Sequence, residues 1–450
     1  MMQLSDIASL FNFVKPVADC VIDGVSTDSR NIQAGDLFVA LKGENFNGHD
    51  YLQAAVDKGA VAAIVDHDVE LPIPTIKVND TLIALGDLAA WWRKQLKLKV
   101  VGLTGSNGKT TVKDMLTCIL SEVGMTTSTR GNFNNDIGLP LTLLQIRPEH
   151  EFAVIEMGAN HAGEIAYLTK ITRPDVAILN NAGAAHLEGF GSLQGVAEAK
   201  GEIFSGLKKK GIAIVNIDDL YADYWMSLCD DHKKIFFGFD EAANVTTSTP
   251  VENYNGCFML QLEKNETEVC LKVLGVHNLK NALAASAAAV ALGIDISMIK
   301  KGLEKFSGVK GRLQLFKAQN DSIVIDDSYN ANPASMKAAI DVLSQQVKPS
   351  LLVMGDMGEL GENAVELHAD IGDYAKEKNI NTLMTFGALS KNAADRFGEN
   401  GFAYDEKQQL IMAASEKIKQ GVAVLVKGSR SMRMEDVVAA LVDDNKMGAA

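Results

Sequence analysis

The arrangement of hydrophobic and polar residues predicts a small α/β unit at the N-terminus. Two short apolar runs, at residues 36–41 and 60–65, predict strands, and residues 51–58 between them predict a helix. Glycine and asparagine residues, which favour turns, separate these elements. The unit ends near residue 80, where the pattern changes.

A run of alternating strands and helices begins at Lys99. Residues 100–104 are apolar and lead into a glycine-containing loop, after which apolar residues recur at helical spacing. Three further runs, at residues 152–155, 176–179 and 212–215, are apolar throughout, which is typical of buried parallel strands. We therefore predict a doubly wound parallel sheet with crossover helices.

The pattern changes twice more towards the C-terminus. Residues 235–276 alternate apolar and polar positions, which predicts antiparallel strands added to the central sheet, and residues 278–292 predict a helix that closes it. After Gly311, apolar runs separated by helix-length segments predict a second Rossmann-like domain. These runs cover residues 323–325, 351–354, 383–386 and 422–426. The predicted class is α/β with three domains, at residues 1–82, 83–311 and 312–450.

The composition is that of an acidic globular protein. Of the 450 residues, 47% are hydrophobic and 22% are charged, a balance that excludes a disordered or collagen-like chain. Lys and Arg number 43 against 57 Asp and Glu, which gives a formal net charge of −14. A broad electrostatic surface for nucleic acid or anionic lipid is therefore not expected, and any anionic ligand must be held by local groups.

The sequence favours a cytoplasmic protein. Its longest apolar stretch, residues 282–294, is shorter than the about 20 residues that cross a bilayer. The N-terminus carries Asp6 and no early Lys or Arg, unlike a secretory signal. The five cysteines are odd in number and form no C-x-x-C pair. We expect a protein of the reducing cytoplasm that has no stable membrane insertion and is a monomer.

The most informative segment is Gly-Leu-Thr-Gly-Ser-Asn-Gly-Lys-Thr-Thr, at residues 102–111, between a strand and a helix. Glycines let backbone N–H groups surround phosphate oxygens, and the helix N-terminus adds positive potential. Lys109 is then expected to reach the β- and γ-phosphates, and the Thr110 hydroxyl to bind Mg²⁺. The strict motif has glycine where Leu103 stands, and the alternative is a turn with a surface lysine. The segment predicts ATP or GTP binding by Gly105, Ser106, Asn107, Gly108, Lys109, Thr110 and Thr111.

A carboxylate at the end of a neighbouring strand would complete a magnesium site. Glu156 directly follows the run at 152–155 and meets this requirement, although strand ends also carry acids without such a role. His186 follows the next strand, at the same predicted sheet edge, where an imidazole either binds a divalent metal or is structural. Lys200 has the pattern of a solvated lysine on a helix.

Two more groups have a possible role at a nucleotide. Asn278 and Asn281 lie one turn apart at a predicted helix start, where Asn278 could be the N-cap. Alternatively, both amides could pair with the edge of a purine. Arg312 begins the last domain, and its guanidinium could reach phosphates across a cleft.

Together these segments resemble the Mur ligase family, ATP-dependent amide-forming enzymes of peptidoglycan precursor synthesis. The resemblance covers essentially the whole chain and includes the missing first glycine of the phosphate loop. It implies that Glu156 and His186 bind a second Mg²⁺ and that Lys200 is carbamylated. A carbamate converts a cation into an anionic oxygen ligand suited to Mg²⁺.

The same resemblance implies further contacts to the nucleotide. Asn278 and Asn281 would contact adenine, while Arg312 and Asp327 would complete the nucleotide site from the third domain. Lys109, Glu156, His186 and Lys200 would be the catalytic residues.

Three segments resemble the branch of the family that adds D-alanyl-D-alanine to UDP-N-acetylmuramoyl-tripeptide. They are residues 131–140, 326–333 and 353–361. The sister branch that adds the third amino acid usually carries Asp-Asn-Pro-Arg, which this sequence lacks. The resemblance implies that ATP converts the tripeptide carboxylate into an acyl phosphate, which the dipeptide amine attacks. Asn134, Asn135, Asn330 and Asn332 are the candidate substrate-binding residues in these segments.

In the first domain, residues 25–30 and 41–50 are similar to the segments that hold the UDP group in this family. Arg30 and Lys42 would supply charge for a diphosphate, and Phe46 a surface for uracil. Turn residues and a core Phe explain the same segments without a ligand. The candidate residues are Ser29, Arg30, Lys42, Asn45 and Phe46.

Two other functions fit parts of the sequence. A folylpolyglutamate-synthetase-like ligase would use a similar phosphate loop, but the UDP-like first domain argues against it. A P-loop regulatory ATPase would bind partners and turn over ATP without any amino-acid substrate. A nucleic-acid motor is disfavoured by the net charge of −14 and the lack of a basic stripe.

Overall fold

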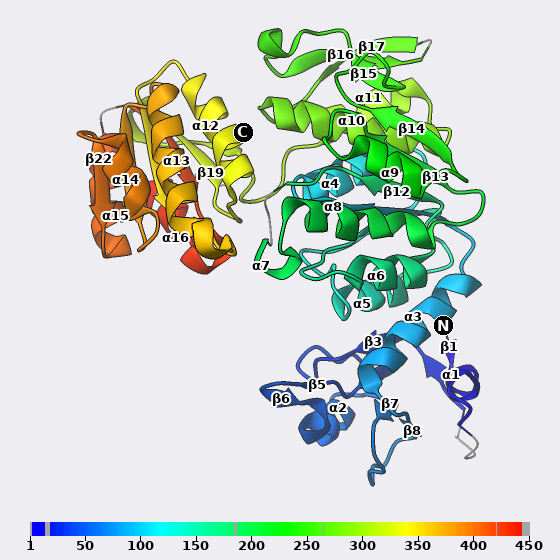
Figure 1. Cartoon of the computed structure of the whole chain (residues 1–450). Coiled ribbons are helices and arrows are strands. Elements are labelled where there is room, and N and C mark those ends of the chain that lie inside the picture. The colour runs from blue at the N-terminus through cyan, green and yellow to red at the C-terminus, as the bar shows by residue number, and fades with distance from the viewer. Residues whose placement is uncertain (1, 14–18, 184–186, 264, 420, 443–450) are drawn as a thin grey trace.

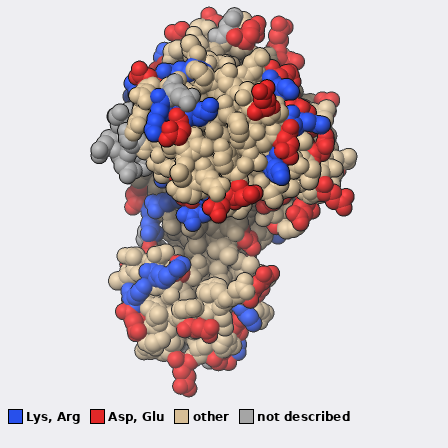
Figure 2. Space-filling model, turned by 90° about the vertical axis from the view of Figure 1, so that its left-hand side faces the viewer, with Lys and Arg blue, Asp and Glu red and all other residues tan. Residues whose placement is uncertain are grey.

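The computed structural model describes residues 2–13, 19–183, 187–263, 265–419 and 421–442. Its three larger sheets belong to three successive parts of the chain, which Figure 1 shows as an N-terminal, a central and a C-terminal body. Figure 2 shows the N-terminal body below a narrow waist, with charges of both signs scattered over the face in view. The predicted three-domain α/β fold is confirmed.

The N-terminal sheet contains four strands in the order β3-β4-β7-β8, all parallel. Its strands are β3 (Gly24–Ser26), β4 (Asp36–Val39), β7 (Ala62–Val65) and β8 (Thr75–Lys77). Shorter elements are β1 (Met2–Gln3), α1 (Leu4–Leu10), β2 (Val21–Ile22), β5 (Lys42–Gly43), β6 (Phe46–Asn47), the 3-10 helix η1 (Gly48–Tyr51) and α2 (Leu52–Asp57). The two predicted strands and the predicted helix are present as β4, β7 and α2.

Helix α3 (Thr81–Gln95) joins this unit to the central one. The Asp80 side chain caps it by accepting hydrogen bonds from the backbone N–H groups of Leu82 and Ile83. Buried residues of α3, among them Leu85, belong to one hydrophobic cluster that spans both units. The predicted boundary at residues 82–83 lies in the first turn of this shared helix and stays a prediction.

The central sheet contains nine strands in the order β10-β11-β9-β12-β13-β14-β15-β16-β17. They are β9 (Lys99–Thr104), β10 (Thr126–Ser128), β11 (Phe152–Glu156), β12 (Val176–Leu179), β13 (Ile212–Asn216), β14 (Lys233–Phe237), β15 (Val245–Thr247), β16 (Cys257–Leu262) and β17 (Asn265–Cys270). Only β15, β16 and β17 pair antiparallel, so the prediction of antiparallel strands is wrong for β14, which lies parallel to β13. Its alternating pattern reflects unequal burial of its two faces, which occurs in either strand direction.

Helices cover both faces of the central sheet. Cluster residues from α4 (Lys109–Leu120), α10 (Val276–Ala291) and α11 (Ile296–Lys305) pack on one face. Those from α3, α5 (Gly138–Leu144), α6 (Glu164–Thr172), α8 (Leu193–Gly201) and α9 (Ala222–Leu228) belong to the other cluster. Shorter elements are α7 (Leu187–Phe190), η2 (Glu202–Gly206) and η3 (Val251–Asn253). The glycine loop before α4 therefore sits on a rigid three-layer support.

The C-terminal sheet has six strands in the order β18-β19-β23-β20-β21-β22, with only β18 antiparallel. Its strands are β18 (Gln314–Lys317), β19 (Ile323–Asp327), β20 (Ser350–Gly355), β21 (Thr382–Phe386), β22 (Gly401–Tyr404) and β23 (Ala423–Lys427). Its helices are α12 (Pro333–Ser344), α13 (Ala364–Glu377), α14 (Lys391–Phe397), α15 (Lys407–Ile418) and α16 (Glu435–Leu441), with 3-10 turns η4 (Gln319–Asp321), η5 (Gly361–Asn363) and η6 (Arg430–Met432). The predicted boundary at 311–312 lies between α11 and β18 and also stays a prediction.

Two cysteines form a disulfide that the sequence did not predict. Cys257 and Cys270 lie opposite each other in the register of β16 and β17 and are joined by a disulfide bond. Their separation of 13 residues hides this pairing from the sequence, because only the hairpin register brings them together. Cys20, Cys118 and Cys229 are free.

None of the helices in the described part of the chain combines the length and the hydrophobicity that crossing a bilayer requires.

The packing of α11 on α4 generates a stability prediction. A Cβ added at Gly302 in α11 would overlap the Ile119 backbone in α4, and overpacking of a rigid contact costs about 1–3 kcal/mol. We expect Gly302→Ala to lower the free energy of unfolding in urea by that amount. Gly43→Ala is the control, because its Cβ would lie 3.7 Å from the nearest atom. Equal stabilities of the two variants would contradict the packing argument.

Candidate functional site

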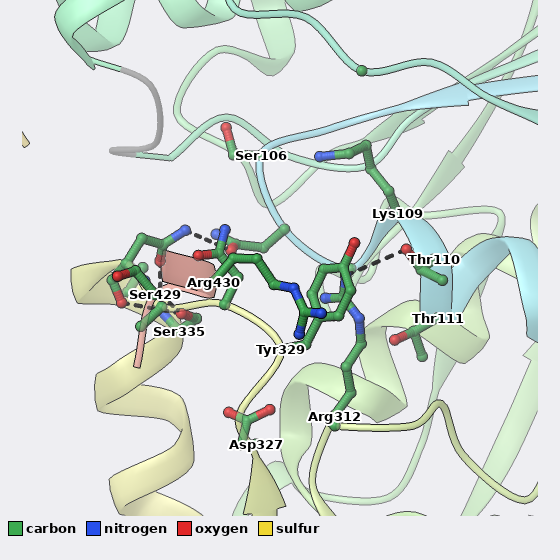
Figure 3. Close-up of a pocket in the computed structure, with 18 of the residues that line it drawn as sticks. Ser106, Lys109, Thr110, Thr111, Arg312, Asp327, Tyr329, Ser335, Ser429 and Arg430 are labelled. Atoms are coloured by element: carbon green, nitrogen blue, oxygen red, sulfur yellow. Dashed lines mark hydrogen bonds between the residues drawn. The ribbon is translucent and has the colours of Figure 1, made fainter. Parts of the chain in front are cut away.

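A cavity of about 680 Å³ lies between the central and C-terminal domains. The glycine loop and the end of β11 form one side, and the loops after β19 and β23 form the other. Figure 3 shows polar side chains from both domains directed into this space. The site is therefore built where the carboxyl ends of parallel strands from two sheets meet, a position where α/β proteins bind ligands.

The glycine loop has the geometry expected for binding phosphate. Gly108 is the N-cap of α4 with φ 77°, and a Cβ there would overlap Asn281 Oδ1, so a residue with a side chain would be strained and crowded. The Lys109 ammonium donates to the Gly105 carbonyl at 2.7 Å. Burial lowers the pKa of Lys109, while Glu156 opposes the shift. A phosphate placed here would restore a charged partner to this lysine.

Two asparagine side chains that follow β12 hydrogen-bond to the backbone of the phosphate loop. Asn180, at the end of β12, donates from Nδ2 to the Asn107 carbonyl at 2.9 Å and to Asn281 Oδ1 at 3.2 Å. Asn181 Oδ1 accepts from the Asn107 backbone N–H at 2.8 Å. Sequence reasoning missed both Asn180 and Asn181. Their position directly after a buried strand, at the same sheet edge as the loop, was the available signal.

Glu156 lies at the end of β11 with one of its carboxylate oxygens unpaired. Asn134 Nδ2 donates to Oε1 at 2.8 Å, and the Glu156 backbone N–H donates to Thr129 Oγ1 at 2.9 Å. Oε2 is buried and has no hydrogen-bond partner within the described part of the chain. Asn134, a candidate substrate ligand, thus orients Glu156, while Asn135 Oδ1 accepts from the N–H of Gly138 at the start of α5.

Lys200 is buried, which corrects its interpretation as a solvated helix lysine. Its side chain lies within α8 at 1% exposure, 5.3 Å from the centre of the Phe190 ring. Burial, aided by repulsion from Lys109, lowers the pKa of Lys200 to about 7. A substantial fraction of its amine is therefore neutral near physiological pH. His186, the other candidate on this side, lies outside the described residues.

The C-terminal domain contacts the glycine loop at two points. Arg312 Nη2 donates to Thr110 Oγ1 at 3.3 Å, and Asn332 Nδ2 donates to Asn107 Oδ1 at 2.8 Å. Figure 3 shows the Arg312 side chain extending towards Thr110. Asn332 also caps α12 through a capping box with Ser335, so one residue fixes both the helix start and the contact.

Asp327 is held inside its own domain by an ion pair. Lys427, at the end of β23, lies 2.6 Å from its carboxylate and also donates to the Asn330 carbonyl at 2.8 Å. Burial raises the pKa of Asp327, while Lys427 opposes the shift. Lys427 was missed by sequence reasoning, although it ends the apolar run at residues 422–426.

One of the two interpretations of Asn278, that it is the N-cap of its helix, is wrong. Helix α10 begins at Val276 after Gly275, which places Asn278 in the first turn. Asn278 Nδ2 donates to the Leu274 carbonyl at 2.8 Å, and Asn281 Nδ2 donates to Asn278 Oδ1 at 3.3 Å. Both asparagines line the cavity although they are largely buried.

The candidate residues of the first domain lie apart from this cavity, because none of them lines it. Arg30 is 86% exposed at its side chain and pairs with Asp28, and Phe46 is 47% exposed and stacks on Tyr51. Ser29 is partly exposed, while Lys42 and Asn45 are exposed. The following turn is fixed by His49, which accepts from the backbone N–H of Asp66 at 3.2 Å.

Comparison with known proteins identifies the family. The model of the Mur ligase family catalytic domain matches residues 21–93, the Mur ligase middle domain matches 103–289, and the Mur ligase glutamate ligase domain matches 311–430. The chain belongs to the Mur ligase family.

Similar proteins cover nearly the whole chain. The UDP-N-acetylmuramoyl-tripeptide–D-alanyl-D-alanine ligase of Escherichia coli K12 is 44% identical over 98% of each chain, and that of Bacillus subtilis 168 is 36% identical over 94% of each. A crystal structure of MurF from Acinetobacter baumannii has a TM-score of 0.89 at 37% identity, covering 97% of this chain and 98% of its own. MurF from Thermotoga maritima, in complex with ADP, has a TM-score of 0.82 at 30% identity, with coverages of 93% and 96%.

Proposed function

We propose that this chain is an ATP-dependent ligase that adds D-alanyl-D-alanine to UDP-N-acetylmuramoyl-tripeptide. The observation that carries the proposal is the shared cavity, where the phosphate loop of one domain faces polar groups of the next. The Escherichia coli relative with this reaction in its name matches 98% of this chain at 44% identity. The residues of the site do not determine which amino acid is the third residue of the tripeptide.

An amide forms from a carboxylate and an amine only after a carboxylate oxygen becomes a leaving group. In the proposed reaction the terminal carboxylate of the tripeptide attacks the γ-phosphorus of ATP, which gives an acyl phosphate and ADP. The dipeptide amine then attacks the acyl carbon and releases phosphate. Lys109 and Arg312 stabilise the phosphoryl oxygens, so most of the acceleration comes from positioning and charge neutralisation.

The residues at the end of β11 fit a magnesium ion. Glu156 Oε2 is a buried carboxylate oxygen without a hydrogen-bond donor among the described groups, and hard oxygen ligands are those Mg²⁺ takes. Thr110 would hold one Mg²⁺ at the phosphates, and Glu156, His186 and a carbamylated Lys200 would hold the second. A bound Mg²⁺ would supply neutralisation of phosphate charge. Asn134 keeps Glu156 in place through its hydrogen bond at 2.8 Å.

We assign the remaining candidate residues by the same proposal. Asn278 and Asn281 lie at the cavity wall beside the loop, consistent with a contact to adenine. Arg30, Lys42 and Phe46 present two cations and an exposed ring to a uridine diphosphate. The other polar residues of the proposed UDP site are Ser29 and Asn45.

We propose that the enzyme works in the cytoplasm, where ATP is available to it, and that it acts as a monomer. No nucleic acid or membrane is needed for the proposed reaction.

ATP turnover should depend on both the tripeptide and the dipeptide. Phosphate release from Mg-ATP is expected only when the UDP-linked tripeptide and D-alanyl-D-alanine are both present, because the acyl phosphate is consumed by the dipeptide. A coupled phosphate assay and mass spectrometry of the pentapeptide product measure this. ATP turnover that needs neither substrate would indicate a regulatory ATPase instead.

Lys109→Ala is expected to lower kcat by about 100-fold or more, since one preorganised charge at the reacting oxygens is lost. The same phosphate assay measures the effect. Lys209→Ala, an exposed lysine outside the cavity, is the matched control and should retain the wild-type rate. Near-normal product formation by Lys109→Ala would contradict the role of the phosphate loop.

The lowered pKa of Lys200 predicts how carbamylation depends on pH. Only a neutral amine attacks CO₂, forming an N–C bond and releasing a proton, and Lys200 becomes neutral as the pH rises through about 7. With ¹³C-bicarbonate, we expect a carbamate NMR resonance that grows between about pH 6 and pH 8. The resonance should be absent from Lys200→Ala and retained in Lys209→Ala. A resonance common to both variants would disprove the assignment.

A further inference from the structure

The loop after β23 presents three polar side chains to the cavity. Ser429, Arg430 and Ser431 all line it, and the hydroxyl oxygens of the two serines lie 3.2 Å apart. The loop is held in place because the Ser429 backbone N–H donates to the Asp356 carbonyl at 2.8 Å. A Cβ at Gly428 would lie 3.1 Å from Gly355 Cα, so the loop packs directly on β20. These groups therefore form a fixed surface.

Arg430 places a positive charge at the site, and a single one of its guanidinium nitrogens is used in the side-chain hydrogen bond to Glu435. Its Nη1 donates to Glu435 Oε1 at 3.0 Å, and its guanidinium carbon lies 5.9 Å from the centre of the Tyr329 ring. The side chain is 66% exposed. A guanidinium has five N–H donors in a planar fork that matches a carboxylate. Figure 3 shows Arg430 extending from the loop to the ring of Tyr329.

The other cationic residues that line the cavity have partners elsewhere. Lys280 and Lys427 form ion pairs with aspartates of their own domains. Lys109 and Arg312 hydrogen-bond to groups of the phosphate loop. Arg430 is also paired, with Glu435, but its side chain is 66% exposed whereas that of Lys427 is 3% exposed. On the C-terminal domain's side, Arg430 is therefore the cation best placed to bind an anionic substrate group.

The surrounding surface has the shape for a small peptide. Ala334 and Ala338 lie one turn apart on α12 and both line the cavity. Their small side chains leave room where larger residues would project. The carboxyl ends of β19 and β23 are adjacent and parallel here, as in the crevices where α/β sheets bind ligands.

We propose that Arg430, together with the hydroxyls of Ser429 and Ser431, binds the C-terminal carboxylate of the dipeptide. This inference rests on the proposed ligase function. D-Alanyl-D-alanine has a single anionic group, and anchoring it on the C-terminal domain leaves the amine free to face the acyl phosphate at the phosphate loop. The methyl groups of the dipeptide then lie along Ala334 and Ala338.

The test compares two acceptors, D-alanyl-D-alanine and its C-terminal amide, which lacks the negative charge. Hydrogen bonds to charged groups account for about 10- to 100-fold in binding. For the wild-type enzyme, kcat/KM should fall by that factor with the amide. For Arg430→Ala, kcat/KM with D-alanyl-D-alanine should fall equally, mainly through KM, while its kcat/KM with the amide should match the wild-type value.

Arg433→Ala is the matched control, because Arg433 is 71% exposed in the same turn and does not line the cavity. It should discriminate between the two acceptors as the wild type does. If Arg430→Ala still prefers the acid by the wild-type ratio, or loses activity equally with both acceptors, Arg430 does not bind the carboxylate. If the wild type extends the tripeptide with neither acceptor, the ligase function itself is wrong and this inference fails with it.

Discussion

The amide network around the phosphate loop is the interaction on which the site depends. Asn107 lies at its centre: its carbonyl accepts from Asn180 and its side chain accepts from Asn332 of the C-terminal domain. The same Asn180 amide reaches Asn281, so β12, α10 and the loop share donors. Amides satisfy the loop's polar groups without adding charge, which leaves its positive potential available to phosphate. The network therefore connects the phosphate loop to β12, α10 and the C-terminal domain without neutralising the positive potential of the loop.

Two lysines, Lys109 and Lys200, repel each other at the site, and the proposed ligands and modification would relieve this repulsion. Burial also disfavours the charge of both. Carbamylation of Lys200 would reverse its sign, so that repulsion by Lys109 would become attraction. Glu156 interacts electrostatically with Lys109, but its Oε2 is buried and has no hydrogen-bond donor among the described groups. The proposed metal would give this oxygen a partner, and the proposed carbamate would remove the repulsion between the two lysines.

The sequence predicted the inner strands of the three larger sheets and the phosphate loop, because continuous apolar runs and the glycine motif follow local rules. Continuous apolar runs gave β9, β11, β12 and β13, and the glycine loop leads into α4, which begins at Lys109, as expected. The burial of Lys200 could not be predicted, since it depends on packing between α8 and distant elements. Strand direction in β14 was missed because burial periodicity carries no information about the neighbouring strand. Lys427 and Arg430 belong to the site only because β23 inserts between β19 and β20.

The link between the central and C-terminal domains carries the arginine that contacts the phosphate loop. Arg312 lies between Gly311 and Leu313, both of which have positive φ, at 71° and 52°. A left-handed Leu is uncommon and is maintained by its surroundings, here by the bond from the Leu313 N–H to Asp327. The two left-handed residues on either side of Arg312 thus set the path of the chain at this point, from which the Arg312 side chain reaches Thr110 at 3.3 Å. The contact between the C-terminal domain and the phosphate loop therefore depends on the backbone conformation of this short link.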